Sequence, residues 1–126
     1  TFDQKIISVL SIVIIITFST YFSAIQIKEY YKINHPDIVA AGTEADKILP
    51  QNALVVAPYT GDTAFLYQTH RSGWPTEIYY FDKIKQQHPQ NPIYLVSVNF
   101  DNYTNNLLQK YPPLVKNDRF TILKID

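Results

Sequence analysis

The chain has 126 residues, which is room for about one folded domain, and its eleven basic residues balance its eleven acidic ones. The balanced charge gives no reason to expect nucleic acid as a partner. The sequence contains no cysteine, which excludes disulfides, thiolate metal ligands and cysteine nucleophiles.

The first predicted element is the uncharged apolar run Ile6–Ile25. As a helix it would span about 30 Å, the thickness of the hydrocarbon core of a bilayer. A signal peptide has a shorter apolar core, and a buried helix of a soluble protein is rarely apolar on all faces for this length. We therefore predict a transmembrane helix with a helical extension over residues 1–35, and a soluble domain over residues 36–126.

Four serines of this helix fall close to one line on a helical wheel, namely Ser8, Ser11, Ser19 and Ser23. Small hydroxyl residues on one stripe let helices approach closely in lipid, which would make other transmembrane helices partners of this one. Serine hydroxyls also bond back to the preceding turn of their own helix, so both interpretations of the stripe stay open.

The second predicted element is an amphipathic helix over Asp37–Leu49, where apolar side chains recur at spacings of three and four. Pro50 closes this helix. Glu44 and Asp46 are two residues apart and would point to nearly opposite sides of it. We therefore predict that both are solvated surface groups and that they form no carboxylate pair.

Short apolar runs rich in β-branched residues predict strands covered on both faces, at Ala53–Pro58, Pro92–Phe100 and, more weakly, Phe120–Ile125. Between the last two, Asp101 or Asn102 caps a helix that the Pro112-Pro113 pair ends. Strand, helix and strand with short loops predict a parallel crossover.

The predicted fold is thus α/β: a small three-layer domain with a mainly parallel sheet of three or four strands. Within Thr76–Asn91 the sequence TEIYYF fits either an edge strand or the first turn of a helix, and both stay open.

The segment Tyr59–Pro75 is the densest in polar and aromatic residues. It follows the first predicted strand, at the sheet edge where open α/β folds bind ligands. We predict that Asp62 is the N-cap of a helix over Thr63–Arg71. The last two residues of this helix, His70 and Arg71, can carry positive charge, which the negative C-terminal end of the helix dipole stabilises. Gly73 then predicts a left-handed exit, after which the chain turns away.

Capping explains Asp62 better than catalysis does, and packing or a membrane-surface contact explains Trp74 better than stacking on a sugar. As candidate binding residues at the sheet edge we nevertheless take Tyr59, Gly61, Asp62, Tyr67, His70, Arg71 and Trp74.

Motifs of common enzymes are missing from the sequence. Its three glycines form no phosphate-binding loop, its three histidines have no metal-ligand spacing, and there is no G-x-S-x-G nucleophile elbow. We therefore predict no catalytic residue and no metal site, and we expect no cofactor within this part of a protein.

Several parts of the sequence resemble a known family. They are the apolar helix, the AAG and LPQNALVV sequences, and the pairs Gly61-Asp62, Leu66-Tyr67, His70-Arg71 and Gly73-Trp74. They are similar to the C-terminal end of bacterial polytopic C-type glycosyltransferases, in the superfamily of the protein mannosyltransferases and the lipid A aminoarabinose transferase. The resemblance covers about Ile6–Pro75. It implies sugar transfer from a polyprenyl-phosphate donor, with a catalytic acidic residue in an early loop that this sequence does not contain.

The resemblance also implies an integral protein of the plasma membrane, with the soluble domain on the extracytoplasmic side. Its partners would be the lipid bilayer, other transmembrane helices of the same protein and a lipid-linked sugar, whose phosphate or hydroxyls His70 and Arg71 would meet. The alternative is a single-span, membrane-anchored α/β binding or interaction module without enzymatic activity.

Overall fold

The structure is a computed structural model that describes residues 1–28 and 35–126. It contains two compact units, a long helix before residue 35 and a domain from His35 to Asp126. The predicted helical extension that would follow Lys28 falls on residues 29–34, outside the described part of the chain.

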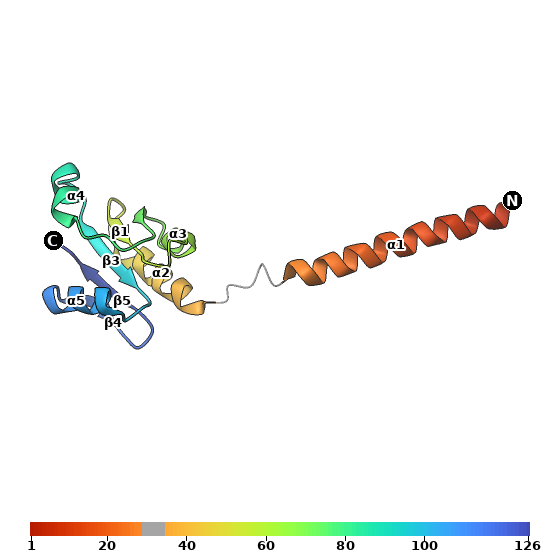
Figure 1. The fold of residues 1–126 in the computed structure, drawn as a ribbon. Coiled ribbons are helices and arrows are strands. Elements are labelled where there is room, and N and C mark those ends of the chain that lie inside the picture. Colours follow the sequence, from red (N-terminus) through yellow and green to blue (C-terminus); the bar gives the residue numbers. More distant parts are fainter. Residues whose placement is uncertain (29–34) are drawn as a thin grey trace. The chain divides into compact units, whose positions relative to one another are not determined.

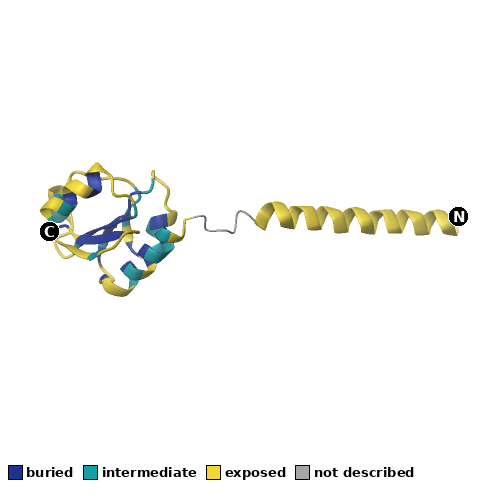
Figure 2. Ribbon diagram, turned by 90° about the horizontal axis from the view of Figure 1, so that it is seen from below, coloured by how far each residue is buried: buried dark blue, intermediate teal, exposed yellow. Residues whose placement is uncertain are grey.

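Helix α1, Phe2–Lys28, has 27 residues and so a length of about 40 Å (Figure 1). Its most apolar stretch has a mean hydropathy of 2.2, and all of its residues are exposed (Figure 2). The helix is therefore long and apolar enough to cross a membrane. Two serines of the stripe bond back to their own helix, Ser8 Oγ to the Gln4 carbonyl at 2.9 Å and Ser11 Oγ to the Ile7 carbonyl at 2.8 Å.

The domain begins with helix α2, Pro36–Ile48, which confirms the predicted amphipathic helix. Proline suits the first helical position because its missing N–H would have no partner there. The buried face carries Ile38, Ala41 and Ala45. Gly42 lies on the same face, where an added Cβ would come within 2.4 Å of Gln68 Cβ, so a glycine is needed for this close helix packing.

A five-stranded sheet forms the centre of the domain, in the order β2-β1-β3-β5-β4. The strands are β1 Leu54–Val56, β2 Ser72–Trp74, β3 Ile93–Ser97, β4 Pro113–Lys116 and β5 Thr121–Lys124. β1 pairs in parallel with both β2 and β3, whereas β5 is antiparallel to both β3 and β4. The sheet is mixed and has five strands, so the prediction of a mainly parallel sheet of three or four strands was wrong.

The error has a local cause after helix α5, Asn102–Lys110. This helix was predicted with either Asp101 or Asn102 as its N-cap, and the structure has Asp101 there. The chain does not go directly to β5 but first forms β4, from residues that the sequence marked only as a helix stop. A tight turn then folds β5 back between β3 and β4, and this makes β5 antiparallel. Pro113 is tolerated in β4 because an edge strand does not need every N–H in its ladder.

The helices cover both faces of the sheet and make three layers. On one face, α2 and the short helix α3, Ala64–Gln68, enclose a core with β-strand residues such as Val55 and Ile122. On the other face, α4, Phe81–Gln87, and α5 enclose a second core. Buried strand residues, coloured dark blue, lie at the centre of the domain in Figure 2.

The segment that the sequence left open, Thr76–Asn91, contains α4 and no strand. The edge strand is instead β2, in the place where we predicted that Gly73 would form a helix exit and the chain would turn away. A Cβ at Gly73 would lie 1.7 Å from the Val55 carbonyl oxygen. Close pairing with β1, rather than a left-handed exit, therefore requires this glycine.

Candidate functional site

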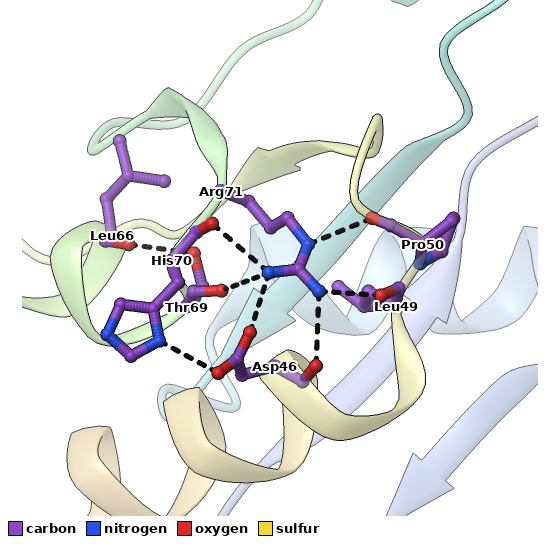
Figure 3. Close-up of polar contacts among 7 residues, drawn as sticks. All are labelled: Asp46, Leu49, Pro50, Leu66, Thr69, His70 and Arg71. Carbon is purple, nitrogen blue, oxygen red and sulfur yellow. Dashed lines mark hydrogen bonds and ion pairs between the residues drawn. The ribbon is translucent and has the colours of Figure 1, made fainter.

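The segment Tyr59–Pro75 forms a shorter helix than its sequence predicts. Helix α3 ends at Gln68, and His70 follows in a left-handed conformation, with φ of 49°. His70 and Arg71 therefore do not end the helix as dipole-stabilising cations, contrary to the prediction. The turn instead directs the side chain of Arg71 into the domain, where it is only 1% exposed (Figure 3).

The Arg71 guanidinium connects the end of α2 to the turn after α3. Its Nη1 donates to Asp46 Oδ1 at 2.7 Å, Nη2 to the Leu49 carbonyl at 2.7 Å, and Nε to the Pro50 carbonyl at 2.9 Å. Further bonds run to the backbone carbonyls of Asp46, Thr69 and His70. These bonds satisfy carbonyls that a helix C-terminus leaves without partners, and they leave no guanidinium nitrogen for a ligand.

Asp46 is the second member of this cluster. Its Oδ1 accepts from Arg71, and its Oδ2 lies 2.9 Å from His70 Nδ1. The hydrogen bond from His70, followed by the one from Arg71, holds the pKa of Asp46 below its ordinary value. The prediction of a merely solvated carboxylate was wrong for Asp46, because a residue that follows it by 25 positions folds back onto it. We call Asp46, His70 and Arg71 the α2–α3 ion cluster.

Asp62 and Tyr59 have mainly local contacts. Thr63 takes the N-cap position of α3, while Asp62 Oδ1 accepts from the Ala64 N–H at 2.8 Å. Asp62 thus caps the first turn, though one residue earlier than a standard N-cap. The half-buried Tyr59 ring packs edge-on against Phe65, with centroids 6.2 Å apart, and against His35, at 5.6 Å.

The remaining candidates do not form one cluster, although the Tyr67 and His70 rings lie edge-on with their centroids 6.2 Å apart. Tyr67 is exposed on α3, and Trp74 is half-buried in β2 against the second core. Gly61 lies in the turn after β1 with φ of 81°. Of the seven predicted binding residues, only Gly61 lines a hollow at the edge of the sheet.

That hollow lies at the carboxyl ends of β1, β2 and β3. It has a volume of about 430 Å³ and takes one part of its wall from the loop after each strand: Gly61 after β1, Glu77 after β2, and Asn99 with Asp101 after β3. β1 is followed by α3 on one face and β3 by α5 on the other, so the hollow opens where the two connections diverge. Such switch points are the usual ligand sites of open α/β sheets.

A second hollow of about 540 Å³ adjoins the first, and the two share Glu77, Tyr79 and Asp101 in their walls. It extends along α5 to Lys110 and Tyr111. We call the two hollows together the carboxyl-edge crevice. It combines two carboxylates with several aromatic rings and amides, a mixture of apolar wall and convergent polar groups that is typical of ligand sites.

One buried tyrosine holds the wall of the crevice in place. The Tyr103 hydroxyl donates to the Ile78 carbonyl at 2.8 Å and accepts from the Ile78 N–H at 3.2 Å, which fastens the segment after β2 to α5. Burial, which outweighs the hydrogen bond to Ile78, raises the pKa of Tyr103 to about 12. The side chain therefore stays neutral and serves as a fixed support.

The neighbouring tyrosine is exposed and directed toward the carboxylates. Tyr79 is 75% exposed, its ring lies edge-on to that of Tyr103 at 5.3 Å, and its hydroxyl donates to Glu77 Oε2 at 2.7 Å. This hydrogen bond, followed by partial burial and the charges of Glu77 and Asp101, raises the pKa of Tyr79. Both carboxylates thus act on the same point in the crevice.

Asp101 Oδ1 accepts from the Thr104 N–H at 2.9 Å as the cap of α5, which fixes this carboxylate at the rim. Within residues 1–28 and 35–126, no three histidine, aspartate or glutamate side chains lie close enough together to hold a metal ion. The sequence singled out Asp101 only as a cap and left the conformation around Glu77 and Tyr79 open.

No family model, no curated protein sequence and no solved structure matches this chain. The resemblance to membrane glycosyltransferases therefore depends on the sequence motifs within Ile6–Pro75 alone.

Proposed function

We propose that this chain is the last membrane helix and the extracytoplasmic, non-catalytic cap of a glycosyltransferase that uses a polyprenyl-phosphate sugar. The observation that carries the proposal is the combination of two features in one chain. The 27-residue apolar helix α1 suits a bilayer, and the following domain has an open crevice at the carboxyl edge of its sheet. A lipid-linked sugar likewise combines a chain that lies in lipid with a head that lies in water.

The path of the chain supports this proposal. The His35 ring lies 5.6 Å from the ring of Tyr59, directly before Thr60 and Gly61 in the crevice wall. The first described residue of the domain, His35, therefore lies near the same edge of the sheet as the crevice. Arg71 and His70 were the expected contacts of the sugar phosphate, but Arg71 is fully committed to the α2–α3 ion cluster. The crevice is thus the better place for the sugar unit of the ligand.

The proposal is tested by native mass spectrometry of the chain in lipid nanodiscs. We expect the chain to retain a polyprenyl-phosphate sugar in preference to polyprenyl phosphate of the same chain length, because only the former has a sugar for the domain. Equal retention of the two lipids, or retention of neither above bulk phospholipid, would contradict a role with lipid-linked sugars.

The alternative, a single-span membrane-anchored binding module, can be distinguished from this proposal by identifying what α1 contacts in the membrane. A photo-crosslinking residue at Ser11, on the serine stripe, would react with other protein helices in the membrane if the chain belongs to a multi-helix enzyme. The matched control is Val13, which lies about 160° from Ser11 on the helix wheel. Crosslinks to lipid alone from both positions would favour the single-span module.

A further inference from the structure

The polar groups of the carboxyl-edge crevice are of mixed kind. Glu77 and Asp101 can only accept hydrogen bonds when ionised, Lys110 can only donate them, and Asn102 and Asn106 can do both. Together these side chains surround one space of about 540 Å³, which is large enough for a small organic ligand.

This mixture disfavours ligands that carry a full charge. A phosphate or carboxylate would face Glu77 and Asp101, whose combined charge already acts on the Tyr79 hydroxyl. An organic cation would be attracted by these two carboxylates, but it would also face Lys110 and the positive end of the α5 helix dipole. A neutral molecule with many hydroxyls meets neither penalty, because each hydroxyl can donate to a carboxylate or accept from an amide or ammonium group.

The aromatic side chains restrict the ligand further. Tyr79 offers an exposed ring, and the Tyr103 ring supports it edge-on at 5.3 Å. Phe81 and Tyr111 also line this hollow and add apolar surface to its wall. An exposed aromatic ring on a rigid support favours a flat ligand face made of C–H groups, which a pyranose ring has beside its hydroxyls.

We propose that the carboxyl-edge crevice binds a neutral sugar unit, with the sugar ring stacked on Tyr79 and its hydroxyls donating to Glu77 and Asp101. The assignment of the ligand class depends on the side chains of the crevice. Only the further step, that this sugar belongs to the donor or the acceptor of a transfer reaction, depends on the proposed function.

Binding is measured by NMR titration of the isotope-labelled full chain in a micelle without sugar head groups, because a maltoside detergent would compete. The probes are methyl glucoside, methyl mannoside and N-acetylglucosamine as neutral sugars, with glucosamine as the cationic and glucose 6-phosphate as the anionic analogue. We expect at least one neutral sugar to bind with a dissociation constant of about 1–10 mM, as is typical of a shallow site with few contacts. The shifted amides would be those of Glu77, Tyr79, Asn102 and Asn106.

Variants test the assigned contacts. Tyr79→Ala should weaken the binding about tenfold, and Glu77→Gln should weaken it severalfold, since each removes one contact and leaves the fold intact. The matched controls are Tyr80→Ala, the adjacent exposed tyrosine outside the crevice wall, and Asp118→Asn, an exposed carboxylate between β4 and β5. Both controls should bind as the wild type does.

The proposal is overturned if no neutral sugar shifts these amides, if only a charged analogue binds, or if Tyr80→Ala weakens binding as much as Tyr79→Ala. Its failure can be told apart from failure of the proposed function. Retention of a lipid-linked sugar with shifts outside the crevice sinks only the crevice assignment, whereas binding of free sugars without retention of the lipid-linked form sinks only the transferase role.

Discussion

Replacement of Arg71 by alanine tests whether this arginine stabilises the fold or binds a ligand. The side chain is 1% exposed, and its guanidinium bonds to Asp46 and to several backbone carbonyls at the ends of α2 and α3. Removing one partner of a buried ion pair costs about 3–5 kcal/mol. Because the Asp46 side chain is 38% exposed and would regain water, we expect about 3 kcal/mol, at the lower end of this range.

The assay is urea unfolding of the full chain in micelles, followed by the fluorescence of Trp74, the only tryptophan, which lies in β2 three residues after the substitution. A loss of about 3 kcal/mol lowers the equilibrium constant for folding by roughly two orders of magnitude. The matched control is Arg119→Ala, which removes the other arginine of the chain.

Arg119 also binds an aspartate, Asp37, at 2.6 Å, but both side chains are 47% exposed. Exposed ion pairs of this kind contribute about 0–1 kcal/mol. If Arg71→Ala destabilises the domain no more than Arg119→Ala does, the structural role of Arg71 is refuted, and a ligand-binding role as first predicted from the sequence becomes the better explanation.

Three further predictions concern other parts of the chain. Hydrogen bonds, first from His70 and then from the buried Arg71 guanidinium, hold the pKa of Asp46 below its ordinary value of 3.8. The ionised Asp46 side chain therefore contributes fully to stability above this pH, and the contribution is lost as the pH falls through the lowered pKa. The difference in unfolding free energy between wild type and Asp46→Asn should therefore shrink as the pH falls through the lowered pKa of Asp46, and an unchanged difference would contradict the ion cluster. Gly73→Ala should destabilise the domain by more than about 3 kcal/mol, since the added Cβ would lie 1.7 Å from a backbone oxygen. Gly61→Ala should destabilise it by only about 1–2 kcal/mol, because the surroundings of Gly61 are open. Thermal melts of the two variants measure the difference. Ile14→Lys should make membrane insertion less favourable by about 3 kcal/mol, and an unchanged fraction in the membrane pellet after alkaline extraction would contradict a central position in the bilayer.

The sequence was sufficient to predict the elements with strong periodicity. The spacing of apolar residues gave α2, and the short β-branched runs gave β1 and β3. The cap at Asp101 gave the start of α5, because a local hydrogen bond decides that boundary. In these places, local and tertiary preferences agree.

The missed elements are short edge strands. β2 has three residues and contains a glycine, and β4 begins with a proline, so neither shows a strand pattern. Both are strands only because a neighbouring strand supplies their hydrogen bonds, which is a tertiary effect. The direction of β5 depends on β4, so one missed edge strand also changed the predicted topology.

The sites depended on residues far apart in the sequence. Asp46 and Arg71 are separated by 25 positions, and no local pattern reveals that the turn after α3 brings them together. The sequence predicted that a ligand site would lie at the carboxyl edge of the sheet, but it did not predict which side chains line the crevice there. Glu77 and Tyr79 lie in the segment whose conformation the sequence left open, so their position beside Asp101 required the structure.

The most direct test of the central claim is an amide chemical-shift map of the labelled chain in nanodiscs during titration with a polyprenyl-phosphate sugar. We expect the shifted amides of the domain to fall in the loops after β1, β2 and β3, at residues 58–61, 76–79 and 99–106. Shifts confined to α1, or centred on α3 and the turn through Arg71, would contradict the claim that the carboxyl-edge crevice holds the sugar.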